Sequence, residues 1–163
     1  METIKCLKTR RCKRDLQPGN VDKKVIEEII DCGHLAPTAN NIQPCEFVVI
    51  TDRQTLIKLS QIAVNGSFAK SASFCVVVIA KNEKYYVEDG SAATENILLA
   101  VNDFGLSACW VAGDKKDYAD AVLKLLGVPQ GYKLVSILPV GVSKSQAAVQ
   151  KRDLKDVLHW EKF

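Results

Sequence analysis

A run of basic residues near the start of the sequence has side chains that could bind an anionic ligand. Residues 5–14 contain six Lys and Arg and no acidic residue, and Arg10–Arg14 reads Arg-Arg-Cys-Lys-Arg. Guanidinium groups bind phosphate through paired hydrogen bonds, and several that converge on one dianion offset its loss of hydration. Lys151 and Arg152 lie at the other end of the chain and would complete a phosphate clamp if the two ends meet. The alternative is a solvated basic surface.

The sequence lacks the motifs of several other kinds of active site. It contains no GxGxxG, GxxxxGK[ST], HExxH or GxSxG pattern, so dinucleotide-fold, P-loop, zinc-protease and nucleophile-elbow chemistry have no support. His34 and His159 are far apart, and His34 is expected to cap or pack at a helix end. We expect no metal site and no catalytic side chain. An enzyme with this sequence would take its chemistry from a cofactor.

Length and composition predict one globular domain spanning residues 1–163. The chain is 47% hydrophobic and 25% charged, and a chain of this size buries one core. It has neither an apolar run of about 20 residues, as a membrane span needs, nor a secretory signal. Six scattered cysteines without a CxxC pair favour reduced thiols, so we expect a cytoplasmic protein without a membrane partner. A nucleic-acid partner is disfavoured because no aromatic residues alternate with the basic ones.

Hydrophobic periodicity predicts helices and strands that alternate irregularly along the chain, which indicates an α+β sandwich with a mixed sheet between helices. Asp22 and Asp52 are expected to cap the first two of these helices, and Gly105 to end the third. The tail, 151–163, is charged but contains five large apolar residues, so we expect it to pack against another surface. The helices are predicted over 23–35, 54–62, 90–104 and 114–126, and the strands over 46–51, 74–80, 107–111 and 132–140.

Five segments in register resemble motifs of the FMN-dependent nitroreductase family. Arg10–Arg14 is similar to its RRSxR opening, and residues 36–49 (APTANNIQPCEFVV) to APSxxNxQPWxFVVV. Residues 93–110 are similar to AxxNLLLAAxxLGLGxCW, and 127–141 to GIPEGY followed by PVG. Residues 157–160 (VLHW) match the C-terminal VVHW. Together these segments span nearly the whole chain, in one of the shorter versions of the fold.

The resemblance implies a sheet that is mostly antiparallel, flanked by helices, in a homodimer whose C-terminal segments are exchanged. It implies FMN at the dimer interface and NADH or NADPH as reductant. The reaction would be ping-pong transfer of electrons to a nitroaromatic, a quinone or a related small-molecule acceptor. The alternative is a flavin-binding protein of the same fold with a specialised reduction (of an enone, a halogenated substrate or a flavin) or with little turnover. A nucleic-acid-binding module is the third possibility.

The resemblance also implies which residues would bind FMN. Arg10, Arg11 and Arg14 would hold its phosphate and ribityl chain, and Arg152 with Lys151 would close the phosphate site. Cys12 stands where the family has Ser, which weakens a hydroxyl hydrogen bond, and Cys45 stands where it has Trp. The flavin ring would contact Asn65 and backbone N–H groups around Val111, Ala112 and Gly113. The other subunit would contribute Pro37, Thr38, Ala39 and Asn41.

Overall fold

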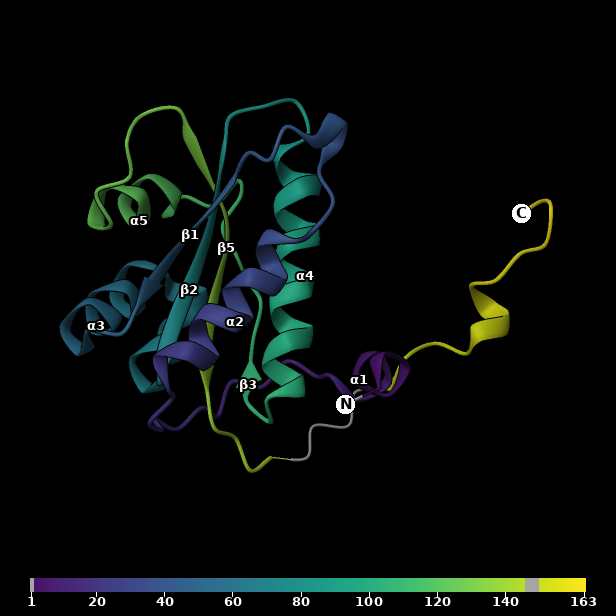
Figure 1. Cartoon of the computed structure of the whole chain (residues 1–163), viewed down its shortest axis with the longest axis horizontal. Coiled ribbons are helices and arrows are strands. Elements are labelled where there is room, and N and C mark those ends of the chain that lie inside the picture. Colours follow the sequence, from purple (N-terminus) through teal and green to yellow (C-terminus); the bar gives the residue numbers. More distant parts are fainter. Residues whose placement is uncertain (1, 146–149) are drawn as a thin grey trace.

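An antiparallel sheet of five strands forms the centre of the computed structural model, which describes residues 2–145 and 150–163. The strand order is β1-β2-β5-β3, and β4 also pairs with β5 (Figure 1). All four ladders are antiparallel, while an isolated parallel bridge joins Cys12 to Ala108. The strands are β1 (Cys45–Ile50), β2 (Phe74–Lys81), β3 (Ser107–Ala108), β4 (Val111–Ala112) and β5 (Tyr132–Gly141).

Helices cover both faces of the sheet, as the sequence predicts. Helices α2 and α4 lie on one face, and α3 and α5 lie on the other (Figure 1). The α-helices are α1 (Thr3–Thr9), α2 (Lys23–His34), α3 (Arg53–Ile62), α4 (Tyr86–Asp103) and α5 (Ala119–Leu125), and the 3-10 segments are η1 (Ala39–Asn41), η2 (Val64–Ser71) and η3 (Leu154–Asp156). This arrangement confirms the α+β sandwich.

Strand β2 divides the core into two halves. Its residues Phe74–Ala80 are all buried, which confirms the expectation of a strand covered on both faces. Because successive side chains point to opposite faces, Val76 and Val78 pack toward α2 and α4, whereas Cys75 and Val77 pack toward α3 and α5. This double burial fixes the strand's register, since a slip by one residue would exchange the two sets of side chains.

A β-bulge in β5 interrupts the central ladder. Val78 pairs with Ser136 but Ile79 pairs with Leu134, which leaves Val135 as the extra residue. The Val135 side chain fills the space over Gly90 of α4, where an added Cβ would lie 2.7 Å from its methyl groups. The bulge thus frees the Val135 backbone to bond to the loop that follows β4.

Several element boundaries differ from the predictions. The predicted strand over 107–111 is two short strands, β3 and β4, separated by Cys109 and Trp110. The helix predicted from Asp114 begins only at Ala119, and α1 and η2 were not predicted. The caps are confirmed: Asp22 accepts a hydrogen bond from the Lys24 N–H and Asp52 from the Thr55 N–H.

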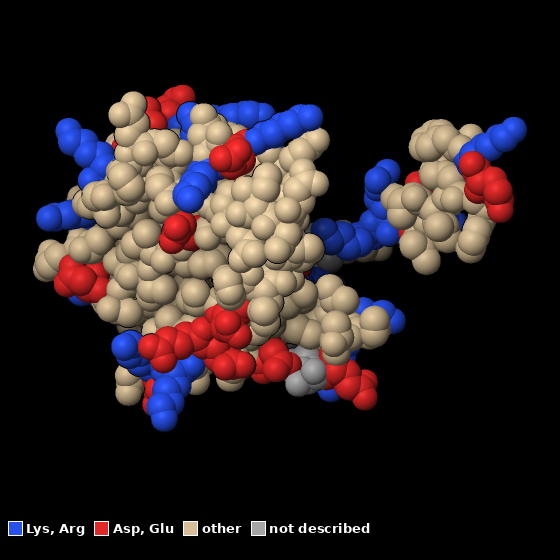
Figure 2. Space-filling view, turned by 45° about the horizontal axis from the view of Figure 1, so that its top comes forward, with Lys and Arg blue, Asp and Glu red and all other residues tan. Residues whose placement is uncertain are grey.

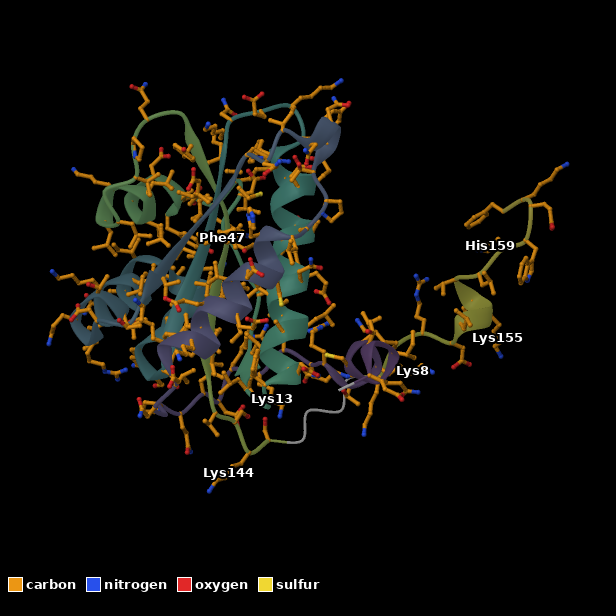
Figure 3. The ribbon with its side chains drawn as sticks, viewed as in Figure 1. Lys8, Lys13, Phe47, Lys144, Lys155 and His159 are labelled. Atoms are coloured by element: carbon orange, nitrogen blue, oxygen red, sulfur yellow. The ribbon has the colours of Figure 1, made fainter. Side chains whose placement is uncertain are left out.

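The tail extends away from the body of the molecule (Figures 1 and 2). Trp160 is 77% exposed and Phe163 is fully exposed. Lys155 and His159 lie in the same extended segment (Figure 3). The expectation that the tail packs on another surface is therefore not met within a single copy. In the described part of the chain, no helix combines the length and apolar character that crossing a membrane requires.

Candidate functional site

The basic segment Arg10–Arg14 runs beside the end of β3. The backbone of Cys12 bridges Ala108, and the Lys13 N–H donates to the Ala108 carbonyl at 2.9 Å. Upstream, Thr9 bonds to Asn102 near the end of α4 (Asn102 Nδ2 to Thr9 Oγ1, 3.3 Å). Helix α4 and β3 therefore position the segment from two sides. Lys13 is labelled near β3 in Figure 3.

The guanidinium groups of the segment differ in how far they are already paired. The Arg10 Nε lies 3.1 Å from Glu95 Oε1 of α4. Arg11 donates to the carbonyls of Lys8 and Arg10, at 3.0 and 2.7 Å, and so is turned back onto its own backbone. Arg14 is exposed and has no acidic partner among the residues that the structure describes. Arg14 is therefore the side chain most available to an incoming anion.

Cys12 and Cys109 form a thiol pair inside this cluster. A hydrogen bond from Cys109, a backbone N–H of Trp110 and nearby Arg10 together lower the pKa of Cys12 to about 5, although partial burial opposes the shift. The same hydrogen bond, together with burial, raises the pKa of Cys109. The two shifts run in opposite directions, so these surroundings favour ionisation of Cys12 over ionisation of Cys109.

The loop after β4 is anchored by the bulge in β5. The backbone N–H groups of Gly113 and Asp114 donate to the Val135 carbonyl at 3.0 and 3.3 Å. The Gly113 N–H is therefore already bonded within the sheet, and the expected contact of the backbone N–H groups here with a flavin ring stays a prediction. Val111 is buried and Ala112 is exposed. Of the three residues expected to face the flavin ring here, only Ala112 is therefore exposed.

Tyr118 connects Asn65 to the same loop. Its hydroxyl donates to the Ala112 carbonyl, and its side chain is hydrogen-bonded to Asn65. On the other side, the Tyr86 hydroxyl donates to Asp114, and this bond raises the pKa of Tyr86 to about 12. Asn65 and the loop are therefore held together, as their common expected role requires.

The loop that contains Pro37, Thr38, Ala39 and Asn41 lies at the opposite end of α4. The Ala39 N–H donates to the buried carboxylate of Asp89 at 2.9 Å, and Thr38 Oγ1 accepts from the Gln43 N–H at 3.0 Å. Asp89 lies six residues before Glu95, the α4 residue that pairs with Arg10, which is about 9 Å along the helix at 1.5 Å per residue. No hydrogen bond or ion pair joins this loop to Arg10–Arg14 among the residues that the structure describes.

Lys151 and Arg152 are exposed at the start of the tail. Neither makes an ion pair or hydrogen bond with Arg10–Arg14 among the residues of 2–145 and 150–163. Figure 2 shows Lys and Arg side chains gathered where the tail approaches the body. The expected clamp of the two chain ends is therefore not closed within one copy.

The comparisons with known proteins decide the family. The Nitroreductase family model matches residues 7–83 and 64–142, which together cover most of the chain. The chain belongs to the nitroreductase family. An Archaeoglobus fulgidus protein named "Putative NADH dehydrogenase/NAD(P)H nitroreductase" is 34% identical over 172 residues, covering 99% of both chains.

Two solved structures place this nitroreductase-family chain in the same fold. A Clostridium difficile "FMN-dependent Nitroreductase" is 28% identical with a TM-score of 0.90, covering 98% of this chain and 99% of that one. A Bacteroides thetaiotaomicron protein with the same name as the A. fulgidus relative is 24% identical, with a TM-score of 0.93 over 99% of this chain and 98% of that one. The second likeness concerns the fold alone.

Sequence reasoning missed several residues that shape the site of this nitroreductase-family chain. Asp89, Glu95 and Tyr118 interact with partners remote in sequence (Ala39, Arg10 and Asn65), so no local motif identifies them. It also missed an apolar groove of about 900 Å³ between α2 and β1. Phe47 lines this groove and is labelled between α2 and the sheet in Figure 3.

Replacing Gly113 by Ala is expected to destabilise the fold. An added Cβ would lie 2.5 Å from Leu134 Cγ and 3.0 Å from the backbone carbon of Val135. Overpacking of this kind costs about 1–3 kcal/mol, which urea unfolding would measure. Gly66→Ala is the matched control, since its Cβ would meet the Val111 methyl groups at 3.4 Å and the Ala63 Cβ at 3.8 Å, which are ordinary van der Waals contacts. That variant should change the unfolding free energy by less than about 1 kcal/mol, in the stabilising direction. Equal destabilisation in both variants would contradict this reading of the loop.

Proposed function

We propose that residues 1–163 form a single FMN-binding domain that transfers electrons from NADH or NADPH to a small-molecule acceptor. The observation that carries the proposal is the basic segment beside β3, next to the loop that Tyr118 ties to Asn65. The basic segment bridges β3 and Tyr118 bonds to β4, and both of these strands pair with β5, which supports a shared site along this edge of the sheet. The acceptor we propose is a nitroaromatic, a quinone or a related compound.

The residues of the segment fit the phosphate group of FMN. Four cations, Arg10, Arg11, Lys13 and Arg14, stand against two negative groups, Glu95 and the Cys12 thiolate. The surplus is positive, and Arg14 is unpaired among the described residues. When bound, FMN would supply the electron-transfer chemistry that no side chain here offers. The chain's own part would be to hold the phosphate through these guanidinium groups and to orient the ring beside Ala112 and Asn65.

We further propose a homodimer in which the tail of each copy lies on the other. Five large apolar residues of the tail are exposed, and the body exposes apolar residues of its own near α1 and the ends of α2 and α4. Apolar surface of this extent is typical of an interface. Exchange of the tails would also let Lys151 and Arg152 reach the basic segment of the other copy. The loop that contains Pro37, Thr38, Ala39 and Asn41 would reach that segment across the same interface. The exposed body residues are Ile4, Leu7, Leu35, Ile42 and Phe104.

The first test is the absorbance spectrum of the purified protein, followed by anaerobic titration with NADH and with NADPH. We expect a flavin spectrum that bleaches on addition of either reductant or of one of them. Steady-state kinetics with a quinone or a nitroaromatic should then give parallel double-reciprocal lines, because reductant and acceptor would use one site in turn. Colourless protein that binds DNA with a steep salt dependence would instead favour the nucleic-acid alternative.

The proposal also predicts how substitutions at titratable residues behave. We expect that no single His, Cys or carboxylate substitution abolishes turnover while FMN stays bound, because no side chain is assigned a proton transfer. Substitutions of His34 and Cys109 are the sharpest cases, and reductive half-reactions by stopped flow would measure them. A variant at either residue that keeps its flavin but loses hydride transfer would contradict this mechanism, as would intersecting double-reciprocal lines.

A further inference from the structure

The thiols of Cys12 and Cys109 are close enough to become bonded to each other. Cys12 bridges Ala108, the residue before Cys109, and the side chains of the two cysteines lie close enough to shift each other's pKa. From the spacing of paired strands and the rise per residue, Cα atoms offset by one position are about 6 Å apart. A disulfide requires a Cα separation of about 4.4–6.8 Å. Both cysteines are unpaired in the structure.

The surroundings of the pair make the two sulfurs chemically different. Cys12 is partly exposed, whereas Cys109 is 1% exposed beneath it. The Arg10 guanidinium approaches the Cys12 sulfur (Nη1 to Sγ, 3.9 Å), and Arg14 acts on Cys109 from the same side. Glu95, an acid that approaches this group, is paired with Arg10. Reactive cysteines sit in partly exposed, electropositive sites of this kind, and the thiolate is their nucleophilic form.

We propose that Cys12 and Cys109 are a modification site at which a hydroperoxide drives an intramolecular disulfide. The Cys12 thiolate attacks the peroxide, so that an S–O bond forms as the O–O bond breaks, giving a sulfenic acid and, for hydrogen peroxide, a hydroxide ion that takes a proton from solvent to become water. The Cys109 thiol then attacks that sulfur. The S–S bond forms as the S–O bond breaks, and the departing hydroxide takes the Cys109 proton to leave as water. Two thiols are oxidised by two electrons in total, and one peroxide is reduced.

The other cysteines provide internal controls. Burial raises the pKa of Cys45 to about 11 and that of Cys75 still further, and burial with nearby acids raises the pKa of Cys32. These thiols are therefore mostly protonated near neutral pH. At limiting peroxide, Cys12 should react first.

The deciding experiment is peptide mapping of the purified full-length protein after stoichiometric hydrogen peroxide, without reductant. We expect one cross-linked peptide that joins Cys12 to Cys109, lighter than the two free peptides by two hydrogens and lost after reduction. In Cys109→Ser, the Cys12 sulfenic acid should persist and be trapped by dimedone. In Cys45→Ser the cross-link should form as in the parent. A parent protein without this cross-link, or with another pair joined at equal yield, would overturn the proposal.

A second measurement, the pH dependence of alkylation, distinguishes a thiol that reacts because it is ionised from one that reacts only because it is exposed. The rate of iodoacetamide labelling at Cys12 should fall less than about 2-fold between pH 8 and pH 6, because the group stays ionised above a pKa of about 5. The labelling rate of a thiol with an ordinary or raised pKa, such as Cys32, should fall about 100-fold over the same two pH units. Equal pH dependence at the two residues would overturn the assignment of Cys12 as the reactive thiol.

Discussion

A chain truncated after Arg152 is expected to be purified without flavin and to aggregate. The deletion removes the tail's five large apolar residues, which are exposed in a single copy, with Trp160 77% exposed. If these residues cover a second copy, their loss exposes apolar surface on both subunits and leaves each flavin site incomplete. Obligate interfaces of this kind bury more than roughly 2,000 Å², so folding and dimerisation should be inseparable. Sedimentation velocity and the flavin absorbance of the truncated protein would measure both effects.

A point variant in the same segment controls for nonspecific damage to the tail. Lys155 is exposed and makes only a surface ion pair with Asp153, at 3.7 Å. Such pairs contribute at most about 1 kcal/mol, so Lys155→Ala should sediment as the parent does and keep its flavin. If the truncated chain is instead a stable monomer that still holds FMN, the exchanged-tail homodimer is wrong.

The central strands of the sheet could be predicted from the sequence because the order of apolar residues within each strand shows which of its faces are buried. Phe74–Ala80 is apolar at every position, and only a strand covered on both faces buries all of it. The capping aspartates were predictable for a similar reason. Each bonds to a backbone N–H two or three residues away, so the information is entirely local.

The irregular parts of the structure were not predictable because they depend on distant partners. The break between β3 and β4 lies opposite Leu138 and Pro139 of β5, since both short strands keep the same register with β5. Residues 107–111 alone contain nothing that distinguishes one strand from two. The bonds from the Gly113 and Asp114 N–H groups to the Val135 carbonyl likewise depend on a partner that is distant in sequence.

The sequence predicts which types of residue form the candidate site, but not which other side chains these residues contact. The density of charge in Arg10–Arg14 marks an anion site, yet the sequence does not show that Glu95, on α4, neutralises Arg10 in part. Nor does it show that Cys12 meets Cys109, because these two residues are remote in the chain and meet only through the bridge at Ala108. The assignment of the remaining site residues to FMN stays a prediction.

Replacing Arg14 by Ala is expected to weaken FMN binding by about 10–100-fold. Arg14 is exposed and has no acidic partner among the described residues, so in the proposed complex its guanidinium is free to bind the phosphate. A hydrogen bond to a charged group contributes roughly 1.5–3 kcal/mol, which corresponds to that loss of affinity. Arg10→Ala should lower the affinity by less, because binding phosphate competes with the Glu95 pair at 3.1 Å. Fluorescence titration of flavin-free protein with FMN would measure both dissociation constants.

Two further variants test this prediction. One is a control that should leave the FMN affinity unchanged, and the other should raise it. Arg53 begins α3 on the other face of the sheet and is exposed, so Arg53→Ala removes the same charge without touching the segment and should leave FMN affinity unchanged. Glu95→Gln releases Arg10 from its ion pair and removes a negative charge near the phosphate. It should tighten binding by up to about 5-fold, the scale of a partly exposed pair of about 1 kcal/mol. If Arg14→Ala and Arg53→Ala bind FMN equally well, the phosphate is not held by this segment.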